Sequence, residues 1–552
     1  MPGNQPATNT GRASRPMSYV SSSRPHSLLW PQQYTTPEQG RARTGLDRSK
    51  GRTTSLSGSG ALDLDLEGSL LRPKGRKPWS WSRINRLYSR QSRMTRMVLV
   101  VSGGLACLCF FSIFLGHGSI YKRLCHKDGR ALVLARHERA KNITCNPKID
   151  RAIPLAPTVR SNGTHDFDPT VIVLSYDGLR ADYLNRGFTP NILSVGAKGV
   201  IAEYMQPSFP TLTFPNHYTM STGLYPSSHG IIANMFHDPN LNDDFNYKIP
   251  EKSWDPKWWG GEPIWETAVL QNQRSGVIMW PGGESLRPVR PTYHVRHRTG
   301  TSALEKMETL LSWLDKPREE RPTVMTAYIS EVDTAGHDFG PDGKRSQRSL
   351  GEVDAALGVL LDGLQSRGLD KVVNLLLVSD HGMSYVSNAK CIYYDDYIDT
   401  SDLLLEESLQ PHLGVRTKDP KRLHEIYHTL KRVQQKDNLP FQVYRREEIP
   451  ARYNYANNER IAPVVVMADP GYVMTRRDMG LAVVGVHGWD NEMEDMRAIF
   501  MASGPAFPNL GPEKLQAFEN VELYEIIART VGLKVKEGAT DGVRNGYVSQ
   551  PC

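Results

Sequence analysis

The sequence predicts an α/β fold in which helices cover both faces of a central, mostly parallel sheet. Short apolar runs rich in β-branched residues predict buried strands, and they lie at residues 171–175, 324–329, 372–378, 464–467 and 498–501. Amphipathic helical patterns lie between these runs. Because strands alternate with helices along the chain, we expect a sheet that is buried on both sides.

The clearest helical pattern covers residues 346–364. Its apolar residues recur at steps of three and four, at Leu350, Val353, Leu357, Leu360, Leu361 and Leu364. Such steps place them on one buried stripe of a helix. We expect residues 166–552 to form one large domain with insertions, such as the Trp- and Pro-rich region 250–300.

The first 96 residues predict a disordered, basic, cytoplasmic tail. They hold 17 Lys and Arg against 5 Asp and Glu, whereas the whole chain carries +8. The remaining 456 residues therefore carry a net negative charge. A nucleic-acid-binding domain presents a basic face, so the composition argues against one here.

Residues 97–117 predict one transmembrane helix. The stretch from Met97 to Tyr121 has no Asp, Glu, Lys or Arg and is long enough to cross a bilayer. Arginines crowd its amino-terminal flank, which favours a cytoplasmic amino terminus. The result is a single-pass type II membrane protein, whose C-terminal body faces a lumen or the exterior, at the cell surface, the vacuole or another endomembrane.

A stem is expected at residues 118–165. Two glycosylation sequons, at Asn142 and Asn162, both follow the predicted span, as expected for a lumenal or extracellular body. Two of the six cysteines, Cys107 and Cys109, lie inside the span. The other four allow two bridges with three pairings: Cys125, Cys145, Cys391 and Cys552. No CxxC pair occurs, which argues against a thiolate zinc site.

Acidic and imidazole side chains follow three of these apolar runs, and one more histidine follows the apolar stretch Leu481–Val484. They are Asp177, Asp333, His337, Asp380, His381 and His487. Any one of them alone is more often a cap, a turn carboxylate or a solvated histidine. Because α/β sheets bind ligands beyond the carboxyl ends of their strands, four such segments together predict a metal site.

A threonine hydroxyl lies close to a predicted helix start. Thr213 precedes Pro215, a pattern typical of helix entry, and the amino terminus of a helix favours a phosphoryl oxygen. A hydroxyl of pKa far above neutrality is a poor nucleophile, so it needs a coordinated metal to become an alkoxide. Asn234 is a candidate amide donor to the developing charge, although a turn residue is the simpler interpretation.

Six motifs in chain order resemble the ectonucleotide pyrophosphatase/phosphodiesterase family of the alkaline phosphatase superfamily. They are Tyr176-Asp-Gly-Leu-Arg180, Pro210-Thr-Leu-Thr-Phe-Pro-Asn216, Thr222-Gly-Leu-Tyr-Pro-Ser-Ser-His-Gly230, Asp333-Thr-Ala-Gly-His-Asp-Phe-Gly-Pro341, Ser379-Asp-His-Gly-Met383 and His487-Gly-Trp-Asp-Asn491. The resemblance covers roughly residues 168–545 and implies an alkaline-phosphatase-like sheet. The C/S-x-P-x-R setting of sulfatases is absent from the sequence.

The resemblance also implies two Zn²⁺ ions and a covalent mechanism. One ion would bind Asp177, Thr213, Asp380 and His381, and the other would bind Asp333, His337 and His487. Thr213 would attack phosphorus to form a phosphodiester on the threonine, which water would then hydrolyse. Asn234 and an amide near Phe214 would stabilise the equatorial oxygens.

The implied substrates are nucleotides such as nucleoside triphosphates and dinucleotides. In the family the base stacks between the aromatic residue after the nucleophile and a later tyrosine, so Phe214 and Tyr293 are the candidates here, although the spacing around Tyr293 departs from the family pattern. Two alternatives remain open at this point. One is a phosphodiesterase of lipid or choline headgroups, and the other is a catalytically silent membrane receptor of the same fold.

Overall fold

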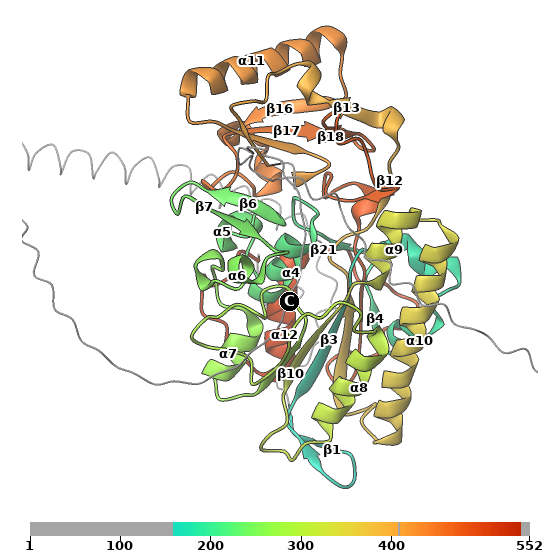
Figure 1. Ribbon diagram of the computed structural model, residues 1–552. Coiled ribbons are helices and arrows are strands. Elements are labelled where there is room, and N and C mark those ends of the chain that lie inside the picture. The colour runs from blue at the N-terminus through green and yellow to red at the C-terminus, as the bar shows by residue number, and fades with distance from the viewer. Residues whose placement is uncertain (1–157, 407–408, 543–552) are drawn as a thin grey trace, which may run out of the picture. The chain divides into compact units, whose positions relative to one another are not determined.

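The computed structural model describes residues 158–406 and 409–542, and its centre is a seven-stranded mixed sheet (Figure 1). From edge to edge the strands are β4 (Val200–Ile201), β20 (Phe500–Ser503), β11 (Val373–Val378), β3 (Thr170–Tyr176), β10 (Val324–Ile329), β8 (Ser275–Ile278) and β9 (Tyr293–Val295). The strands from β11 to β9 run parallel, whereas β20 is antiparallel to both β11 and β4. The larger part of the sheet is therefore parallel, as predicted, and one edge is antiparallel.

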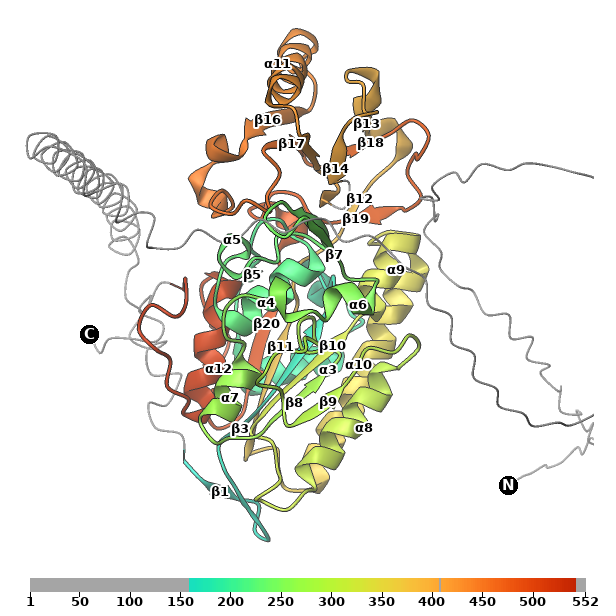
Figure 2. The same cartoon turned by 60° about the vertical axis from the view of Figure 1, so that its left-hand side comes forward.

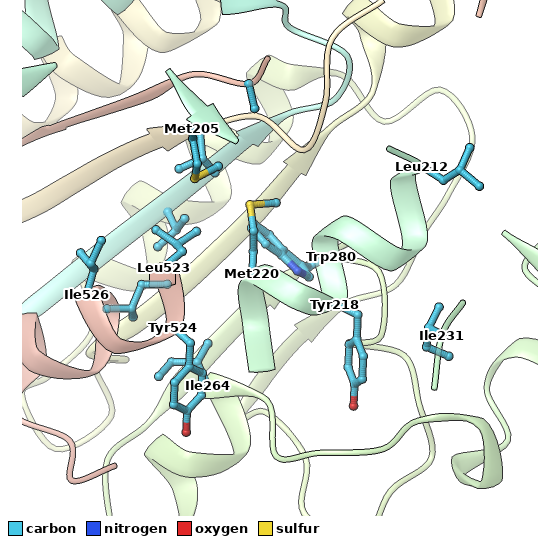
Figure 3. Packing of buried hydrophobic residues seen from close by; sticks show 14 of the residues in the cluster. Met205, Leu212, Tyr218, Met220, Ile231, Ile264, Trp280, Leu523, Tyr524 and Ile526 are labelled. Atoms are coloured by element: carbon cyan, nitrogen blue, oxygen red, sulfur yellow. The ribbon is translucent and has the colours of Figure 1, made fainter. Parts of the chain in front are cut away.

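Helices cover both faces of this sheet (Figure 2). Val171 and Val173 of β3 belong to a buried cluster with α4 (Thr213–Thr222), α7 (Ile264–Leu270) and α12 (Leu523–Val531). Figure 3 shows part of this cluster, in which Met220 of α4 lies near Leu523 of α12. The alternate side chains of β3 face the opposite way, because successive side chains of a strand point to opposite faces.

Ile172 and Leu174 belong to the second cluster, with α3 (Pro190–Lys198), α8 (Ala303–Leu314) and α10 (Lys344–Ser366). The α10 helix confirms the helix predicted at residues 346–364, and Leu350, Val353 and Leu357 are buried as its stripe requires.

The apolar run at residues 464–467 forms a strand in a different sheet from the one expected. It is β17 (Val464–Ala468), in a four-stranded antiparallel sheet with β14 (Leu404–Glu406), β15 (Leu413–Arg416) and β16 (Phe441–Arg445). Val464 packs in the core of this sheet, whereas Val465 packs against the main body. Because β17 is buried on both faces, its sequence looks like that of a central parallel strand.

We call residues 391–475 the inserted lobe, since they lie between two segments that return to the same site. The lobe sheet is covered by α11 (Pro420–Asp437) and flanked by β13 (Cys391–Tyr393), which pairs with β18 (Val473–Thr475). In Figure 1, α11 lies at the far side of the lobe from the central sheet.

The remaining elements are short. The strands are β1 (Arg160–Ser161), β2 (Asp166–Phe167), β5 (Met205–Gln206), β6 (Met235–Asp238), β7 (Asp243–Asn246), β12 (Ser384–Tyr385), β19 (Gly485–Val486) and β21 (Phe518–Glu519). The α-helices are α5 (Pro226–His229), α6 (Pro250–Ser253) and α9 (Glu331–Phe339). The 3-10 helices are η1 (Ala181–Arg186), η2 (Pro256–Trp258), η3 (Asn388–Lys390), η4 (Tyr394–Asp396), η6 (Arg446–Glu448), η7 (Ala451–Tyr453), η8 (Glu494–Met496) and η9 (Asn520–Glu522).

Several expectations concern residues outside the described ranges. They are the tail at 1–96, the membrane span at 97–117, most of the stem at 118–165, the sequon at Asn142 and all cysteines except Cys391. Between residues 158 and 542, no helix that the structure describes combines the length and the apolar character needed to cross a bilayer. The sequon asparagine Asn162 is described, and its Nδ2 donates a hydrogen bond to the carbonyl oxygen of Arg367 at 2.8 Å.

Candidate active site

The three carboxylates of the site lie just after three neighbouring strands. Asp177 directly follows β3, Asp333 lies in the first turn of α9 just after β10, and Asp380 follows β11 by two residues. Because β11, β3 and β10 are adjacent and parallel, their carboxyl ends meet at one edge of the sheet. This is where α/β sheets place ligands.

The first group of candidate metal ligands consists of Asp177, Asp380 and His381, all buried. The Nε2 of His381 lies 3.4 Å from Oδ1 of Asp177 and 2.9 Å from Oδ2 of Asp380. Thr213 joins this group, because its Oγ1 lies 3.3 Å from the same Nε2. Four oxygen and nitrogen atoms therefore converge on one position.

The second group consists of Asp333, His337 and His487. Asp333 and His337 are four residues apart on α9, so they share one face of the helix. The Oδ1 of Asp333 lies 3.4 Å from Nε2 of His337 and 3.5 Å from Nε2 of His487. The rings of His381 and His487 stack with centroids 3.6 Å apart, which brings the two groups into contact.

His487 lies in the site, but the strand before it does not belong to the central sheet, as the sequence had suggested it would. It follows β19, which pairs with β12 in a two-stranded sheet apart from the central one. The expectation that all four segments end strands of one sheet is therefore wrong for His487. Its Nδ1 lies 2.8 Å from the carbonyl oxygen of Thr211, which ties it to the segment that carries Thr213.

Each of the three histidines has its Nδ1 next to a backbone carbonyl oxygen. The acceptors are Gly485 for His337 at 2.7 Å, Gly382 for His381 at 3.0 Å and Thr211 for His487 at 2.8 Å. An Nδ1–H that donates to a carbonyl leaves Nε2 with a free lone pair. This arrangement is typical of histidines that bind a metal through Nε2.

Three buried carboxylate oxygens at the site have no hydrogen-bond partner among the described residues. They are Oδ1 of Asp177, Oδ1 of Asp333 and Oδ2 of Asp380. Leaving buried polar atoms unpaired is costly, and these are the oxygens that face the histidine nitrogens. Buried oxygen and imidazole ligands of this kind suit a divalent cation such as zinc, so the residues present fit two metal ions.

Burial and neighbouring charges shift the pKa values of several groups in the site. Burial, together with the negative charges of Asp333 and Asp380, raises the pKa of Asp177 well above its usual value. Burial would also raise the pKa of Asp380, but the neighbouring His381 and His217 hold it well below its usual value. Burial and the two other histidines lower the pKa of His487. A bound cation would relieve the repulsion among the three carboxylates.

Thr213 is the first residue of α4, as the sequence predicted, and its side chain is buried. The backbone N–H of the next residue, Phe214, donates to Oδ1 of Asn234 at 3.0 Å. The structure therefore places Asn234 next to the nucleophile candidate. Asn234 also engages the Phe214 N–H, the amide that the resemblance assigns to a substrate oxygen.

Two side chains behind the carboxylates, the partly buried Tyr328 and the buried His217, were not found from the sequence. Tyr328 of β10 donates a hydrogen bond to Oδ2 of Asp177. His217, one turn after Thr213 on α4, has its Nδ1 2.9 Å from the Thr213 carbonyl oxygen and 3.3 Å from Oδ2 of Asp380. The four-residue step from Thr213 to His217 was a usable signal, whereas nothing in the sequence marks Tyr328 apart from its position on a strand.

Gly178 allows the loop after β3 to approach α9. Its φ is +68°, and a Cβ at this position would lie 3.0 Å from the Cα and Cβ of Asp333. Its N–H donates to Oδ1 of Asp380 at 3.1 Å. A side chain at residue 178 would therefore disturb both groups of ligands.

Among the aromatic rings that the structure places around Phe214, the nearest is that of Tyr247, with ring centroids 5.0 Å apart. Burial and the negative charges of Asp333 and Asp177 raise the pKa of Tyr247 to about 12. The spacing of motifs along the chain gave no sign of this residue.

Tyr293 does not lie in the site. It is the first residue of β9 and pairs with Gly276 of β8. Gly276 in turn pairs with Met325, which lies several residues before the carboxyl end of β10. At about 3.3 Å per residue, Tyr293 lies near the opposite end of the sheet. Its hydroxyl donates to the carbonyl oxygen of Glu320. The prediction that Tyr293 forms a wall of the base pocket is therefore wrong.

The sequence matches the family described as type I phosphodiesterase/nucleotide pyrophosphatase over residues 171–490. An uncharacterized pyrophosphatase/phosphodiesterase of Schizosaccharomyces pombe is 42% identical over 68% of this chain and 79% of its own length. Ectonucleotide pyrophosphatase/phosphodiesterase family member 3 of Bos taurus is 36% identical over 69% of this chain. A venom phosphodiesterase of Macrovipera lebetinus is 37% identical over 69%. This chain spans 44% of the length of the bovine relative and 45% of that of the venom relative.

The fold resembles that of murine ectonucleotide pyrophosphatase/phosphodiesterase 5, with a TM-score of 0.63 and 32% identity, over 68% of this chain and 97% of the murine one. A second structure of the murine protein is described as an inactive threonine-to-alanine variant in complex with AMP, and it matches with the same TM-score, identity and coverage.

Proposed function

Since the chain belongs to the type I phosphodiesterase/nucleotide pyrophosphatase family, we propose that it hydrolyses pyrophosphate and phosphodiester bonds of nucleotides and releases nucleoside monophosphates. The observation that carries this proposal is the pair of candidate metal groups beside the hydroxyl of Thr213. Its substrates would include nucleoside triphosphates and dinucleotides.

Thr213 is the proposed nucleophile. Its Oγ1 would attack phosphorus, a covalent phosphodiester would form on the threonine, and the first product would leave. Water would then hydrolyse this ester and restore Thr213. The start of α4 supports this role, because the helix dipole favours negative charge at that end.

The proposed cofactors are two zinc ions. One would be held by Asp177, Thr213, Asp380 and His381, and the other by Asp333, His337 and His487. When bound, such ions lower the pKa of a coordinated hydroxyl and stabilise charge on the attacking and leaving oxygens. The histidine Nδ1 contacts with backbone carbonyls hold the imidazoles in the orientation that this requires.

Asn234 and the aromatic residues would bind the substrate. With its Oδ1 taken by the Phe214 N–H, Asn234 would direct its Nδ2–H₂ group to a phosphoryl oxygen and stabilise its charge. Phe214 and Tyr247 would form an aromatic wall for the base, since every base has a face that stacks on such rings.

The test compares two chromogenic esters. The purified, zinc-loaded protein is incubated with a nitrophenyl ester of a nucleoside monophosphate and with nitrophenyl phosphocholine, and Thr213→Ala serves as the control. We expect Thr213-dependent release from the nucleotide ester at a kcat/KM at least tenfold higher than from the choline ester. Preference for the choline ester would support the headgroup phosphodiesterase instead, and release from neither would support the silent receptor.

The membrane topology is a separate proposal, supported by the sequence alone. We propose a cytoplasmic tail at 1–96, one spanning helix at 97–117, a stem at 118–165 and a lumenal or extracellular catalytic domain at 166–552. The full chain should then stay in membranes after alkaline carbonate extraction. Release into the soluble fraction would contradict the spanning helix.

A further inference from the structure

His217 is a buried side chain of α4 that contacts the candidate active site but belongs to neither group of candidate metal ligands. It lies one turn after Thr213, and its Nδ1 is 2.9 Å from the carbonyl oxygen of Thr213 and 3.3 Å from Oδ2 of Asp380. Its Nε2 is 2.8 Å from the hydroxyl oxygen of Ser175. One imidazole therefore joins the backbone of the proposed nucleophile to a proposed metal ligand and to β3.

The partners of His217 determine which of its nitrogens carries a proton. A carbonyl oxygen only accepts hydrogen bonds, so the short contact with Thr213 requires a proton on Nδ1. In the neutral ring, Nε2 then accepts a hydrogen bond from the hydroxyl of Ser175. With both nitrogens occupied, this ring can orient other groups but has no lone pair left for a metal ion.

Two aromatic rings pack against the imidazole of His217. The rings of Trp280 and Tyr328 lie edge to face with it, with centroids at 5.1 Å and 5.0 Å. Trp280, which lies beside α4 in Figure 3, also donates its indole N–H to the backbone carbonyl oxygen of His217 at 3.0 Å. Because His217 is completely buried, its ring cannot turn without displacing these closely packed neighbours.

The two contacts of Nδ1 involve groups that would bind the same metal ion. The hydroxyl of Thr213 begins α4, whereas the carboxylate of Asp380 lies after β11. Partners that orient metal ligands contribute strongly to metal affinity, and a small displacement of a reacting group costs much of its rate. We propose that His217 is a positioning residue that fixes the backbone of Thr213 relative to the carboxylate of Asp380. Its effect on turnover rests on the proposed function, whereas its effect on metal affinity rests on the ligand groups alone.

Two substitutions of His217 separate positioning from packing. His217→Leu keeps a side chain of similar size and removes both hydrogen bonds. His217→Asn is smaller, but its Nδ2–H₂ group can take the place of the Nδ1–H and donate to the same acceptors. Because Asn is less favourable than Leu in a helix and leaves the larger gap, a purely structural role predicts that His217→Asn is the worse variant. A positioning role predicts the opposite order.

The first measurement is zinc affinity, determined on metal-free protein by competition with a fluorescent chelator. We expect His217→Leu to weaken zinc binding at one site by about tenfold or more, within the range seen when partners of metal ligands are removed. His217→Asn should bind zinc within about threefold of wild type, because the donor to Asp380 is retained.

The second measurement is turnover of the nucleotide ester after zinc loading. In His217→Leu, kcat should fall by about tenfold or more while KM changes by less than about twofold, the pattern of a lost interaction that acts only in the transition state. His217→Asn should again recover most of this loss.

Ser175→Ala and Thr219→Val form a matched pair. Each removes a hydroxyl next to Nε2 of a buried histidine, since the Oγ1 of Thr219 lies 3.0 Å from Nε2 of His229, which belongs to neither metal group. Ser175→Ala should lower kcat by about fivefold, the equivalent of one hydrogen bond, whereas Thr219→Val should leave kcat within about twofold. Urea unfolding should show a lower midpoint in both variants.

The positioning role is overturned if His217→Leu keeps wild-type zinc affinity, or if His217→Asn binds zinc no better than His217→Leu does. It is also overturned if Ser175→Ala and Thr219→Val lower kcat equally. A wild-type protein that binds zinc but cleaves neither ester would contradict the proposed function instead. The order of zinc affinities of the two His217 variants would then still show whether His217 positions Asp380.

Discussion

Thr213 begins α4 with its hydroxyl 3.3 Å from Nε2 of His381, so turnover should depend on this oxygen. Thr213→Ala is expected to lower kcat by about 10³-fold or more, in line with losses seen on removing other nucleophiles. Zinc content, measured by elemental analysis, should stay close to wild type because the carboxylate and imidazole ligands remain. A variant that keeps near-wild-type turnover would exclude Thr213 as nucleophile.

The matched control for Thr213→Ala is Thr222→Ala at the other end of α4. The Thr222 hydroxyl donates to the Tyr218 carbonyl oxygen within the helix. Loss of this bond should leave kcat within about twofold, since local bonds of this kind contribute little.

Tyr328 is expected to tune metal affinity, because its hydroxyl donates to the Asp177 oxygen that faces away from the ligand cluster. Tyr328→Phe should weaken zinc binding by about 10–100-fold, the range seen when partners of metal ligands are removed. Competition with a fluorescent chelator measures this directly.

Tyr183→Phe is the control for Tyr328→Phe. Tyr183 is buried, and its hydroxyl has no hydrogen-bond partner among the described residues. Equal zinc affinity of the two variants would mean that Tyr328 does not position Asp177.

Individual site residues were predictable where a side chain that can bind a metal or attack phosphorus directly follows a recognisable strand or begins a helix. Asp177, Asp333 and Asp380 follow recognisable strands, and Thr213 precedes Pro215 at a helix start. Tyr247 and Tyr328 were missed because an aromatic residue on a strand or loop is usually part of a core. Tyr293 was misplaced because motif spacing does not reveal at which end of a strand a residue lies.

At the scale of elements, the loop from β3 to η1 must pass very close to α9. Gly178→Ala should cost about 1 kcal/mol for the positive φ alone, and more because the new Cβ would lie 3.0 Å from Asp333. Both kcat and zinc affinity should fall. Urea unfolding and the nucleotide ester assay measure the two effects.

Gly187→Ala is a control that separates the backbone strain of a positive φ from the steric contact with Asp333. Gly187 also has a positive φ, of +81°, but a Cβ there would meet nothing within 4 Å. This variant should lose only the free energy of unfolding that the positive φ costs, and it should keep wild-type activity. Similar losses of activity in both variants would show that contact with Asp333 is not the cause.

The positions of helices and strands along the chain were predicted better than the sheet to which each strand belongs. The α10 helix lies where its apolar steps placed it, and the central strands follow the β-branched runs. The partner sheet of β17 was not predictable, because burial on both faces looks the same in either sheet. His487 lies after a two-residue strand, which is too short to leave a periodic pattern.

At the scale of the whole molecule, the two metal groups connect α4, α9 and the segments after β3, β11 and β19. Removing zinc with a chelator should lower the thermal unfolding midpoint by several degrees, because binding to the folded state alone stabilises it. Re-added zinc should restore both the midpoint and the activity. An unchanged midpoint in protein shown to be metal-free would contradict the assigned ligands.

Two buried histidines that are far apart in the sequence should make the protein sensitive to acid. Burial lowers the pKa of His229 and of His412 to about 3, and the Nδ1 of each accepts a backbone N–H. The unfolded chain binds these protons near pH 6.5 and the folded chain does not. Stability should therefore fall as pH decreases below about 6.5, by up to about 1.4 kcal/mol per pH unit for each histidine.

Urea unfolding at pH 7, 6 and 5 measures this slope. His412→Gln should flatten it, since one titrating group is removed, whereas His165→Gln, at an exposed position, should leave it unchanged. A slope that is the same in all three proteins would exclude His412 as a source of the acid sensitivity.

The inserted lobe separates His381 from His487 by more than a hundred positions of chain. During synthesis on the ribosome, the three carboxylates therefore emerge well before the last imidazole does. A nascent chain that ends anywhere inside the lobe has one complete ligand group and an unfinished second one. Premature stop codons across the lobe should all produce the same catalytic defect, however much of the protein has already been made.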